Sequence, residues 1–571
     1  MSLKSALLAG GVSLALLTAP AVAQTPPAAP APAAAAPAAP PAKVGGRPNK
    51  VAKIKPVTQA DLLKPAGDEW LSYHGAYNGE HFSTLSDVTV ANVGQLKRAW
   101  ISDVDSPVPS PRAAAPDLTA RPGETGVGGR SVPGSISSGV LMRSGVLFFT
   151  AGLNAYAVDA KTGKQIWHYV ARQSGGLSNR GFAISGDKLL VLYNSGITCL
   201  DAKTGKELWA KQYGGPNLPM APLVVRDHVY VTAGGDGART RGFLASLNVN
   251  TGEREWIVYT TPKEGEFGFN TWPSEETAAV SNGSAWMTPA YDPETNLLIY
   301  GTGNPTPIKD GRARPGDNLC SDSTLALDAD TGKMAWYFQA TPNDDHDYDN
   351  NQGMIFADLP VDGKPRKLVT WISRNGYQFT LDRVTGEHIL THKALDIANW
   401  AKPKLRFSGT PEKDQNKAIN RGGVLLAPNS DGYVNFTAQS FSPVTGLHYA
   451  NTSRTRSMFY WSGEGFFGNT TTALQASDPV TGKVVWEHKY LEPHTPLRTK
   501  TASVLSTAGG LLFSGDISGN FIAFDGKTGK ILWHDELPDS TSYGVPISYK
   551  LDGKQYVMVP AGSKLIAYVL K

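Results

Sequence analysis

The sequence is poor in cysteine. Its 571 residues include only Cys199 and Cys320, which excludes a disulfide-based scaffold. They could form one bridge in an oxidising compartment, or be one unpaired strand residue and one unpaired loop residue. No Cys-x-x-Cys-His motif occurs, which excludes a c-type haem carried by this chain. The net charge is only +4 at pH 7 and no block of Lys or Arg occurs, so nothing indicates nucleic-acid binding.

Long apolar runs are also scarce. The one at the start of the chain has Lys4 before it, apolar residues at 6–17 and the small residues of a cleavage site at 21–23. Residues 1–23 therefore predict a secretory signal peptide and a periplasmic protein. The run is too short for a membrane span and no second one follows, so we expect no membrane anchor. Residues 24–64, which begin with an Ala/Pro-rich stretch, predict a linker before a folded domain at 65–571.

What the sequence does contain is a repeated phrase, Asp-x-x-Thr-Gly-x-x-x-Trp. Its five full copies begin at Asp159, Asp201, Asp328, Asp478 and Asp525. Two variants have Asn248 in place of the Asp and Leu390 in place of the Trp. Thr-Gly allows the positive φ of a tight turn, the Asp can bond the turn's backbone, and Trp is a large apolar anchor. Each copy therefore predicts a hairpin that closes one unit of a repeat architecture.

The spacing of the repeat glycines predicts the fold. Gaps of 42 and 47 residues suit one four-stranded propeller blade, and gaps of 80 and 96 residues suit a blade with an insertion. Seven turns give seven blades. A strand ending in Trp100 and two strands at 555–561 and 564–570 supply an eighth. The prediction is an all-β, eight-bladed β-propeller with four-stranded blades, closed by joining the N- and C-terminal strands, which removes open sheet edges.

The strongest candidate for chemistry is the acidic stretch at 343–349. It contains four aspartates: Asp344, Asp345, Asp347 and Asp349. Two carboxylates about 6 Å apart repel by roughly 3 kcal/mol at an effective dielectric near 20, so a shared pocket needs a cation or a raised pKa. If the stretch is an exposed loop, water relieves the repulsion instead.

Three other polar or aromatic residues are candidates, each with a purely structural alternative. Asn304 follows a predicted strand at 297–300 and can offer an amide oxygen to a hard cation, or form an ordinary Gly-Asn turn. Arg374 lies in a predicted hairpin and can be a site residue or an exposed turn residue. Trp286 does not occupy a repeat position, so it can stack on a planar ligand or fill a core.

At these residues the chain resembles the periplasmic PQQ-dependent alcohol dehydrogenases, the quinoproteins with an eight-bladed propeller. The matching stretches, in order, are 70–73, 82–85, 92–96, 291–293, 301–305, 315–319, 362–367 and 552–557. The resemblance implies two cofactors, PQQ and a metal ion that is Ca²⁺ or a lanthanide(III). It also implies hydride transfer from an alcohol to metal-bound PQQ, which gives a ketone or an aldehyde.

The resemblance assigns roles residue by residue. The catalytic residues are Asp347, as the base for the alcohol proton, and Arg374, at the quinone oxygens. The residues implied to contact PQQ are Arg180, Trp286, Arg374 and Asn435. The implied metal ligands are Asn304, Asp347, Asp349 and Asp236. Asp349 adds a carboxylate that favours a trivalent ion, with Ca²⁺ left open, and Asp236 stands beside Gly237, where the family has a glutamate ligand.

The chain also departs from the family pattern. The adjacent cysteine pair is absent from 173–178, a glutamate expected near Ser137 is absent, and His346 replaces the usual Trp before the catalytic Asp. The loss of the cysteine pair and of the Trp at His346 suggests a roomier pocket for a bulky or secondary alcohol, such as a polyol or a sesquiterpenoid mycotoxin like deoxynivalenol. Because the chain has no haem motif, we expect electrons to pass to a separate cytochrome c. The alternatives are a non-enzymatic eight-bladed periplasmic scaffold and a relic that binds the cofactor without turnover.

Overall fold

The computed structural model describes residues 47–106, 135–172, 176–193, 196–213, 220–234, 239–466, 470–490, 502–516, 518–538 and 544–571. They belong to a compact unit spanning Gly46–Lys571. The predicted signal peptide and the first part of the predicted linker lie outside the described residues. The later part of that linker packs against the sheets, because Ala52, Ile54, Val57 and Leu62 are buried in one apolar cluster with them.

The described residues form an all-β structure with two short helices, α1 (Gln59–Leu62) and α2 (Glu275–Ala279). Five sheets of four strands follow the chain in simple order. They are β3 (Leu141–Arg143), β4 (Val146–Ala151), β5 (Asn154–Asp159) and β6 (Gln165–Val170); β7 (Ala183–Ser185), β8 (Lys188–Tyr193), β9 (Gly196–Asp201) and β10 (Glu207–Gln212); β11 (Leu223–Val225), β12 (His228–Ala233), β13 (Phe243–Asn248) and β14 (Arg254–Tyr259); β15 (Ala290–Asp292), β16 (Leu297–Gly301), β17 (Ser323–Asp328) and β18 (Met334–Gln339); and β19 (Ile355–Val361), β20 (Lys364–Ile372), β21 (Gln378–Asp382) and β22 (His388–His392).

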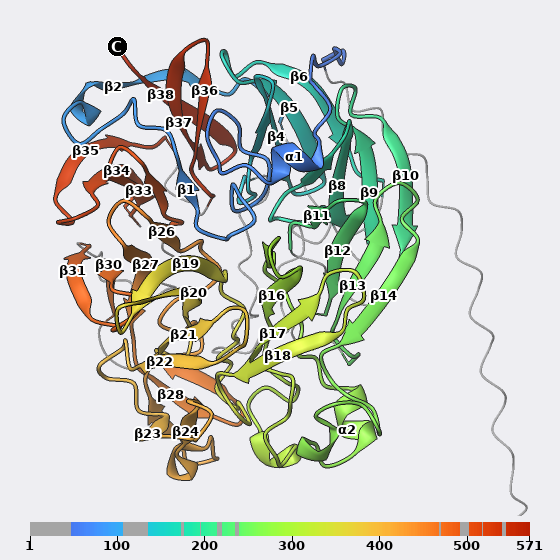
Figure 1. Ribbon diagram of the computed structural model, residues 1–571, viewed down its shortest axis with the longest axis vertical. Coiled ribbons are helices and arrows are strands. Elements are labelled where there is room, and N and C mark those ends of the chain that lie inside the picture. The colour runs from blue at the N-terminus through green and yellow to red at the C-terminus, as the bar shows by residue number, and fades with distance from the viewer. Residues whose placement is uncertain are drawn as a thin grey trace, which may run out of the picture. The chain divides into compact units, whose positions relative to one another are not determined.

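The other three large sheets contain an interruption or join distant strands. They are β26 (Ser440–Ser442), β27 (Leu447–Arg454), β30 (Thr471–Ser477) and β31 (Val484–Lys489); β1 (Phe82–Ser83), β32 (Leu505–Thr507), β33 (Leu511–Gly515), β34 (Asn520–Asp525) and β35 (Ile531–Glu536); and β2 (Leu96–Ile101), β36 (Ile547–Leu551), β37 (Lys554–Ala561) and β38 (Lys564–Leu570). Two small sheets are β23 (Ala401–Leu405) with β24 (Pro411–Lys413), and β25 (Val424–Leu426) with β28 (Ser457–Tyr460) and β29 (Gly463–Phe466). Figure 1 shows the large sheets side by side in chain order.

Each copy of the repeated phrase forms the predicted hairpin, between the last two strands of a sheet. At the first copy, Asp159 Oδ1 accepts hydrogen bonds from the backbone N–H groups of Lys161 (3.1 Å) and Thr162 (2.8 Å), and Gly163 has φ 69°. Each of the two long gaps also contains a further hairpin, β15–β16 in one and β26–β27 in the other. The phrase therefore encodes a local turn, as the sequence indicated.

The Trp of one copy docks on the turn of the next sheet. The indole N–H of Trp100 donates to Ala160 O (3.0 Å) and that of Trp167 donates to Ala202 O (3.0 Å), in each case the residue after the repeat Asp. The repeat glycine lies under the ring, and a Cβ added at Gly205 would meet Trp167 at 2.6 Å. The glycine is thus required twice, for its positive φ and for the close approach of the ring.

In the copy that lacks Trp, a different aromatic ring covers the glycine of the next repeat. Leu390 is in β22, and the ring that lies against the next repeat glycine, Gly482, belongs to His392, two residues further along. The N- and C-terminal strands meet as expected, because β2 pairs antiparallel with β38, with Leu96 opposite Leu570.

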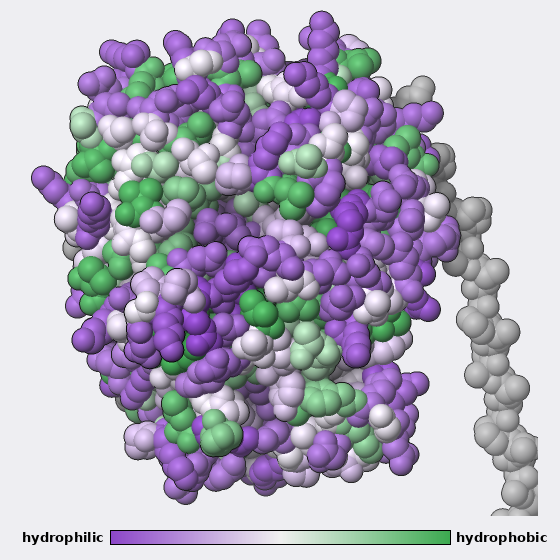
Figure 2. All heavy atoms as spheres, in the orientation of Figure 1, coloured by the Kyte–Doolittle hydropathy of each residue, from purple (hydrophilic) through white to green (hydrophobic). Residues whose placement is uncertain are grey.

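The face shown in Figure 2 is covered mainly by polar side chains, with apolar groups scattered among them. No helix in the described part of the chain is long and apolar enough to cross a membrane. Cys199, in β9, and Cys320, just before β17, are both buried free thiols, so the structure does not contain the bridge left open by the sequence. Burial raises the pKa of each thiol to about 12.

Candidate active site

The acidic stretch is a buried loop that follows β18, not a solvated one. Asp344, Asp345, Asp347 and Asp349 are each at most 2% exposed. Asp344 organises the loop by accepting hydrogen bonds from the backbone N–H groups of His346 (2.9 Å), Asp347 (3.0 Å) and Tyr348 (2.8 Å). Burial opposes ionisation of Asp344, but its hydrogen bond with His346 and the charge of that ring hold its pKa at about 2.

Arg374 connects the two aspartates that the sequence assigned to the site. It follows β20, is 2% exposed, and its Nη1 forms an ion pair with Asp349. Its Nη2 lies 3.5 Å from Asp347 Oδ1. Asp347 has φ 75°, a conformation that a non-glycine residue adopts only when its surroundings impose it. The guanidinium therefore lies between two carboxylates held close together in the interior.

Asp349 also contacts the two other candidates from the long insertion. Its Oδ1 accepts a hydrogen bond from the backbone N–H of Asn304 (2.7 Å), and its Oδ2 accepts one from the indole of Trp286 (3.3 Å). A Cβ added at Gly303 would lie 2.5 Å from Asp349 Oδ1, so this approach requires glycine. Burial raises the pKa of Asp349, and the charge of Arg374 opposes that shift. Three predicted site residues, Asn304, Trp286 and Arg374, thus meet at the carboxylate of a fourth, Asp349.

Arg180 approaches the same group from another sheet. Its guanidinium carbon lies 5.6 Å from the ring centroid of Trp286 and 5.0 Å from that of Phe436. The side chain is buried, and within the described residues its Nε has no hydrogen-bond partner and it forms no ion pair. Burial lowers its pKa from the usual arginine value. A buried cation in this state fits an anionic ligand group, such as a carboxylate of PQQ.

Two predicted site residues need separate treatment, because the side chain of Asn435 bonds elsewhere and Asp236 is not among the described residues. The amide of Asn435 stays within its own turn, donating to Asp431 O (2.8 Å) and accepting from the backbone N–H of Phe436 (2.8 Å). Asn435 is therefore next to a residue that contacts Arg180, without touching the other candidates through its side chain. Asp236 lies outside the described residues, so its assignment as a metal ligand stays a prediction.

His346 is fully buried, and its ring packs among aromatic side chains. The imidazole stacks on Tyr348, with ring centroids 5.0 Å apart, and lies near Trp400. Next to it, the buried Asp345 is 2.7 Å from Lys413 Nζ, which also donates to Asn343 O (2.6 Å). Lys413 belongs to β24, so this ion pair joins the acidic loop to the small β23–β24 sheet.

Sequence reasoning missed three residues of this region. Asp344 shapes the loop, Phe436 holds Arg180, and Asp322 places a further buried carboxylate near the others. Asp344 was at least visible in the acidic stretch. Nothing in a single sequence distinguishes Phe436 or Asp322 from ordinary strand-end and loop residues.

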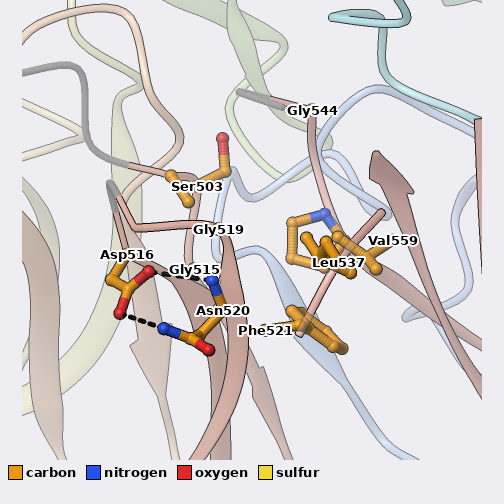
Figure 3. Close-up of a pocket in the computed structure, with 11 residues that line it drawn as sticks. Ser503, Gly515, Asp516, Gly519, Asn520, Phe521, Leu537, Gly544 and Val559 are labelled. Carbon is orange, nitrogen blue, oxygen red and sulfur yellow. Dashed lines mark hydrogen bonds between the residues drawn. The ribbon is translucent and has the colours of Figure 1, made fainter. Parts of the chain in front are cut away.

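A cavity of about 320 Å³, part of it open to solvent, lies elsewhere, among β33, β34 and β37. None of the predicted site residues is among the described residues that line it. Figure 3 shows that its carboxylate, Asp516, is already satisfied by Asn520, whose backbone and side-chain N–H groups both donate at 2.8 Å. The carboxylate that lines this cavity is therefore already paired within the protein.

The residues present fit a hard cation and a planar anion. Carboxylate and amide oxygens are the ligands of such cations, and Asp347, Asp349 and Asn304 supply them. Within the described residues, no three His, Cys, Asp or Glu side chains stand close enough together to enclose a metal already. Arg374 partly neutralises the carboxylates in this arrangement. Trp286 offers an aromatic face and Arg180 a buried positive charge for a flat acidic ligand.

Comparison with known proteins identifies the family. The family model described as "Glucose/ethanol/alcohol dehydrogenase, beta-propeller domain" matches residues 70–189, 215–410 and 472–557. A second model, described as "Outer membrane protein assembly factor BamB", matches only 135–292. The chain is similar to quinohemoprotein alcohol dehydrogenase ADH IIB of Pseudomonas putida, with 32% identity over 87% of this chain and 74% of that protein.

Two further similarities concern lanthanide enzymes. The lanthanide-dependent methanol dehydrogenase of Methylacidiphilum fumariolicum is 30% identical over 88% of this chain and 85% of its own length. A solved europium-containing methanol dehydrogenase superposes with a TM-score of 0.75 at 28% identity, covering 90% of this chain and all of that one. With the family model matching more than half of the residues, the chain belongs to the PQQ-dependent alcohol dehydrogenases, an enzyme family of quinoproteins.

Proposed function

We propose that this chain oxidises a bulky or secondary alcohol to a ketone or an aldehyde in the periplasm, with PQQ and Ca²⁺ or a lanthanide ion as cofactors. The carrying observation is the convergence of Arg374, Asn304 and Trp286 on the buried Asp349, with Asp347 beside the same guanidinium. When bound, PQQ supplies the oxidising power by accepting a hydride from the alcohol carbon. The names of the similar enzymes support both the reaction class and the range of metals.

The chain's own residues have distinct roles in this proposal. Asp347 takes the hydroxyl proton as general base, and its buried position excludes competing water. Arg374 holds Asp347 and Asp349 in place and presents positive charge to the quinone oxygens. Trp286 and Arg180 bind the ring and a carboxylate of PQQ, with Asn435 as a further contact. Asn304, Asp347, Asp349 and Asp236 are the proposed metal ligands.

The proposal includes the rest of the chain. We expect residues 1–23 to direct export and 24–64 to lead into the folded unit, with Ala52, Ile54, Val57 and Leu62 packed against it. We expect residues 65–571 to form an eight-bladed ring, and the pairing of β2 with β38 supports its closure. The seven four-stranded sheets and the five-stranded one in the described residues support that count. Since the sequence has no haem motif, electrons leave through a separate cytochrome c.

One experiment separates this function from the scaffold alternative. The purified chain is mixed with PQQ and either Ca²⁺ or La³⁺, and the absorbance of the quinone and the melting temperature are recorded. An enzyme shows both a spectral change and a thermal shift, and then reduces a dye acceptor with a panel of alcohols. No shift with either metal favours the scaffold, which the match of 135–292 to an assembly-factor family also supports. Binding without turnover indicates the relic. Preference for methanol over all larger alcohols contradicts the proposed substrate class.

A further inference from the structure

One buried carboxylate, that of Asp322, has no role in the proposed function. Asp322 lies between Cys320 and β17, is fully buried, and has φ 47°. Neither of its carboxylate oxygens has a hydrogen-bond partner within the described residues. Burying a charge or a polar group without a partner is costly, so such a group is retained only where it is compensated.

The backbone of Asp322 lies beside the segment that carries the candidate metal ligand Asn304. Its backbone N–H donates to Gly303 O (3.0 Å), and Gly303 immediately precedes Asn304. Gly303 is also the residue whose added Cβ would lie 2.5 Å from Asp349 Oδ1. The backbone of Asp322 is therefore one hydrogen bond away from the segment that carries Asn304 and touches Asp349.

The neighbouring acids have cationic partners, and Asp322 does not. Asp344 lies beside His346 (3.5 Å), Asp345 beside Lys413 (2.7 Å), and Asp347 and Asp349 beside Arg374. The nearest positive influence on Asp322 is the buried Arg314. That guanidinium is engaged with Asn318 Oδ1 (2.8 Å), Pro307 O (3.1 and 3.2 Å) and Asp344 O. Within the described residues, the five acids of this cluster therefore share His346, Lys413 and Arg374, and Asp322 is the acid that forms no ion pair with any of them.

Burial, and then the negative charges of Asp344, Asp349 and Asp347, raise the pKa of Asp322 well above its usual range. The carboxyl group of Asp322 therefore lies in the negative electrostatic potential of the neighbouring aspartates. A cation bound among those aspartates would make that potential positive. A buried acid of this kind next to Asn304 and Asp349 is explained if the site evolved to hold a multivalent cation.

We propose that Asp322 is a further carboxylate of the metal site, which strengthens binding of the cation and favours a trivalent over a divalent ion. This inference rests on the proposed function. The preference follows from Coulomb's law, because the attraction of one added negative charge scales with the charge of the cation. If Asp322→Asn weakens Ca²⁺ binding about tenfold, the same distance predicts about 30-fold weaker La³⁺ binding.

The test measures metal binding without turnover. The full chain is freed of metal by chelation and titrated with Ca²⁺, La³⁺ and Tb³⁺, using calorimetry and Tb³⁺ luminescence excited through tryptophan, since Trp286 contacts Asp349. Asp322→Asn and Asp322→Ser are compared with Asp292→Asn, which removes an acid that is equally buried but paired with Arg383 at 3.0 Å. Both Asp322 variants should lose affinity, La³⁺ more than Ca²⁺, and Asp292→Asn should keep it.

Thermal unfolding supplies the second readout. Without metal, Asp322→Asn should melt at the same temperature as the unmodified chain or at a higher one, because a buried acid without an ion pair has been removed. Adding La³⁺ should raise the melting temperature of Asp322→Asn by less than it raises that of the unmodified chain. If both Asp322 variants bind La³⁺ and Ca²⁺ as tightly as the unmodified chain does, the role of Asp322 is overturned while the proposed function stands. If the unmodified chain binds none of the three ions, both are overturned. Unfolding of Asp322→Asn alone leaves Asp322→Ser to decide.

Discussion

Replacing Arg374 by Met tests whether the two site carboxylates are charged in the folded protein. Arg374 is 2% exposed, forms an ion pair with the equally buried Asp349, and lies 3.5 Å from Asp347. Removing one partner of a buried ion pair costs about 3–5 kcal/mol, because the other charge is left without compensation. Methionine fills most of the volume of the arginine stem, so little of the loss comes from a cavity.

That cost converts into a measurable shift. With an unfolding entropy of about 2.1 cal/mol/K per residue, a unit of this size loses roughly 1 °C in Tm per kcal/mol, so Tm falls by about 3–5 °C at pH 7. The assay is calorimetric unfolding of the metal-free chain. Arg366→Met is the matched control, since Arg366 also pairs with two acids but on the surface, where such pairs contribute little.

Added cation sharpens the result. Ca²⁺ or La³⁺ should raise the Tm of Arg374→Met by more than that of the unmodified chain, because a metal replaces the missing positive charge. A Tm loss below about 1 °C without metal would refute the reasoning, since it would mean that Asp349 and Asp347 are protonated or solvated in the folded state.

Three further predictions concern the base, the repeat and a buried acid. Asp347→Ala should lower kcat by at least about 10²-fold while PQQ still binds, as measured by dye reduction and quinone absorbance; near-normal turnover would remove Asp347 as the base. Trp167→Ala should cost about 3–5 kcal/mol of stability, because the ring is fully buried on Gly205 and its N–H bonds Ala202; an unchanged denaturation midpoint would contradict the docking role. Burial raises the pKa of Glu80 to about 7, so the folded protein holds this proton more tightly than the unfolded chain, and stability falls as pH rises from about 4.5 to 7. Glu80→Gln should therefore stabilise at pH 8 and have little effect at pH 4; an equal effect at both would show that Glu80 titrates normally.

The repeat architecture was readable from sequence because its signal is local. Asp, Thr and Gly set a turn within five residues, and the structure forms that turn wherever the phrase occurs. The packing partner of the Trp could not be predicted from the sequence. Its indole N–H donates to the backbone carbonyl of the residue that follows the Asp of the next repeat, which belongs to the next sheet. The same limit applies to His392, which replaces the missing Trp from a position that the phrase does not include.

The candidate site was only partly predictable for a related reason. Asp347, Asp349, Asn304, Trp286 and Arg374 were candidates from the sequence itself, the family resemblance gave them roles, and the structure brings them together. The residues alone did not decide between a buried and a solvated acidic loop, because burial depends on β24 and on strands distant in sequence. Asp322 could not be identified from the sequence. What distinguishes it is that its buried carboxylate has no hydrogen-bond partner among the described residues, and only the folded structure shows this.

The pairing of Leu96 with Leu570 has a kinetic consequence. The two strands of this ladder are separated by almost the whole length of the folded unit, so β2 has no partner until the last residues of the chain have been synthesised. Contacts of such long sequence separation form late and slowly. Until β38 is in place, the facing edges of β2 and β37 therefore lack a partner strand, and unpaired edges of this kind promote pairing between chains.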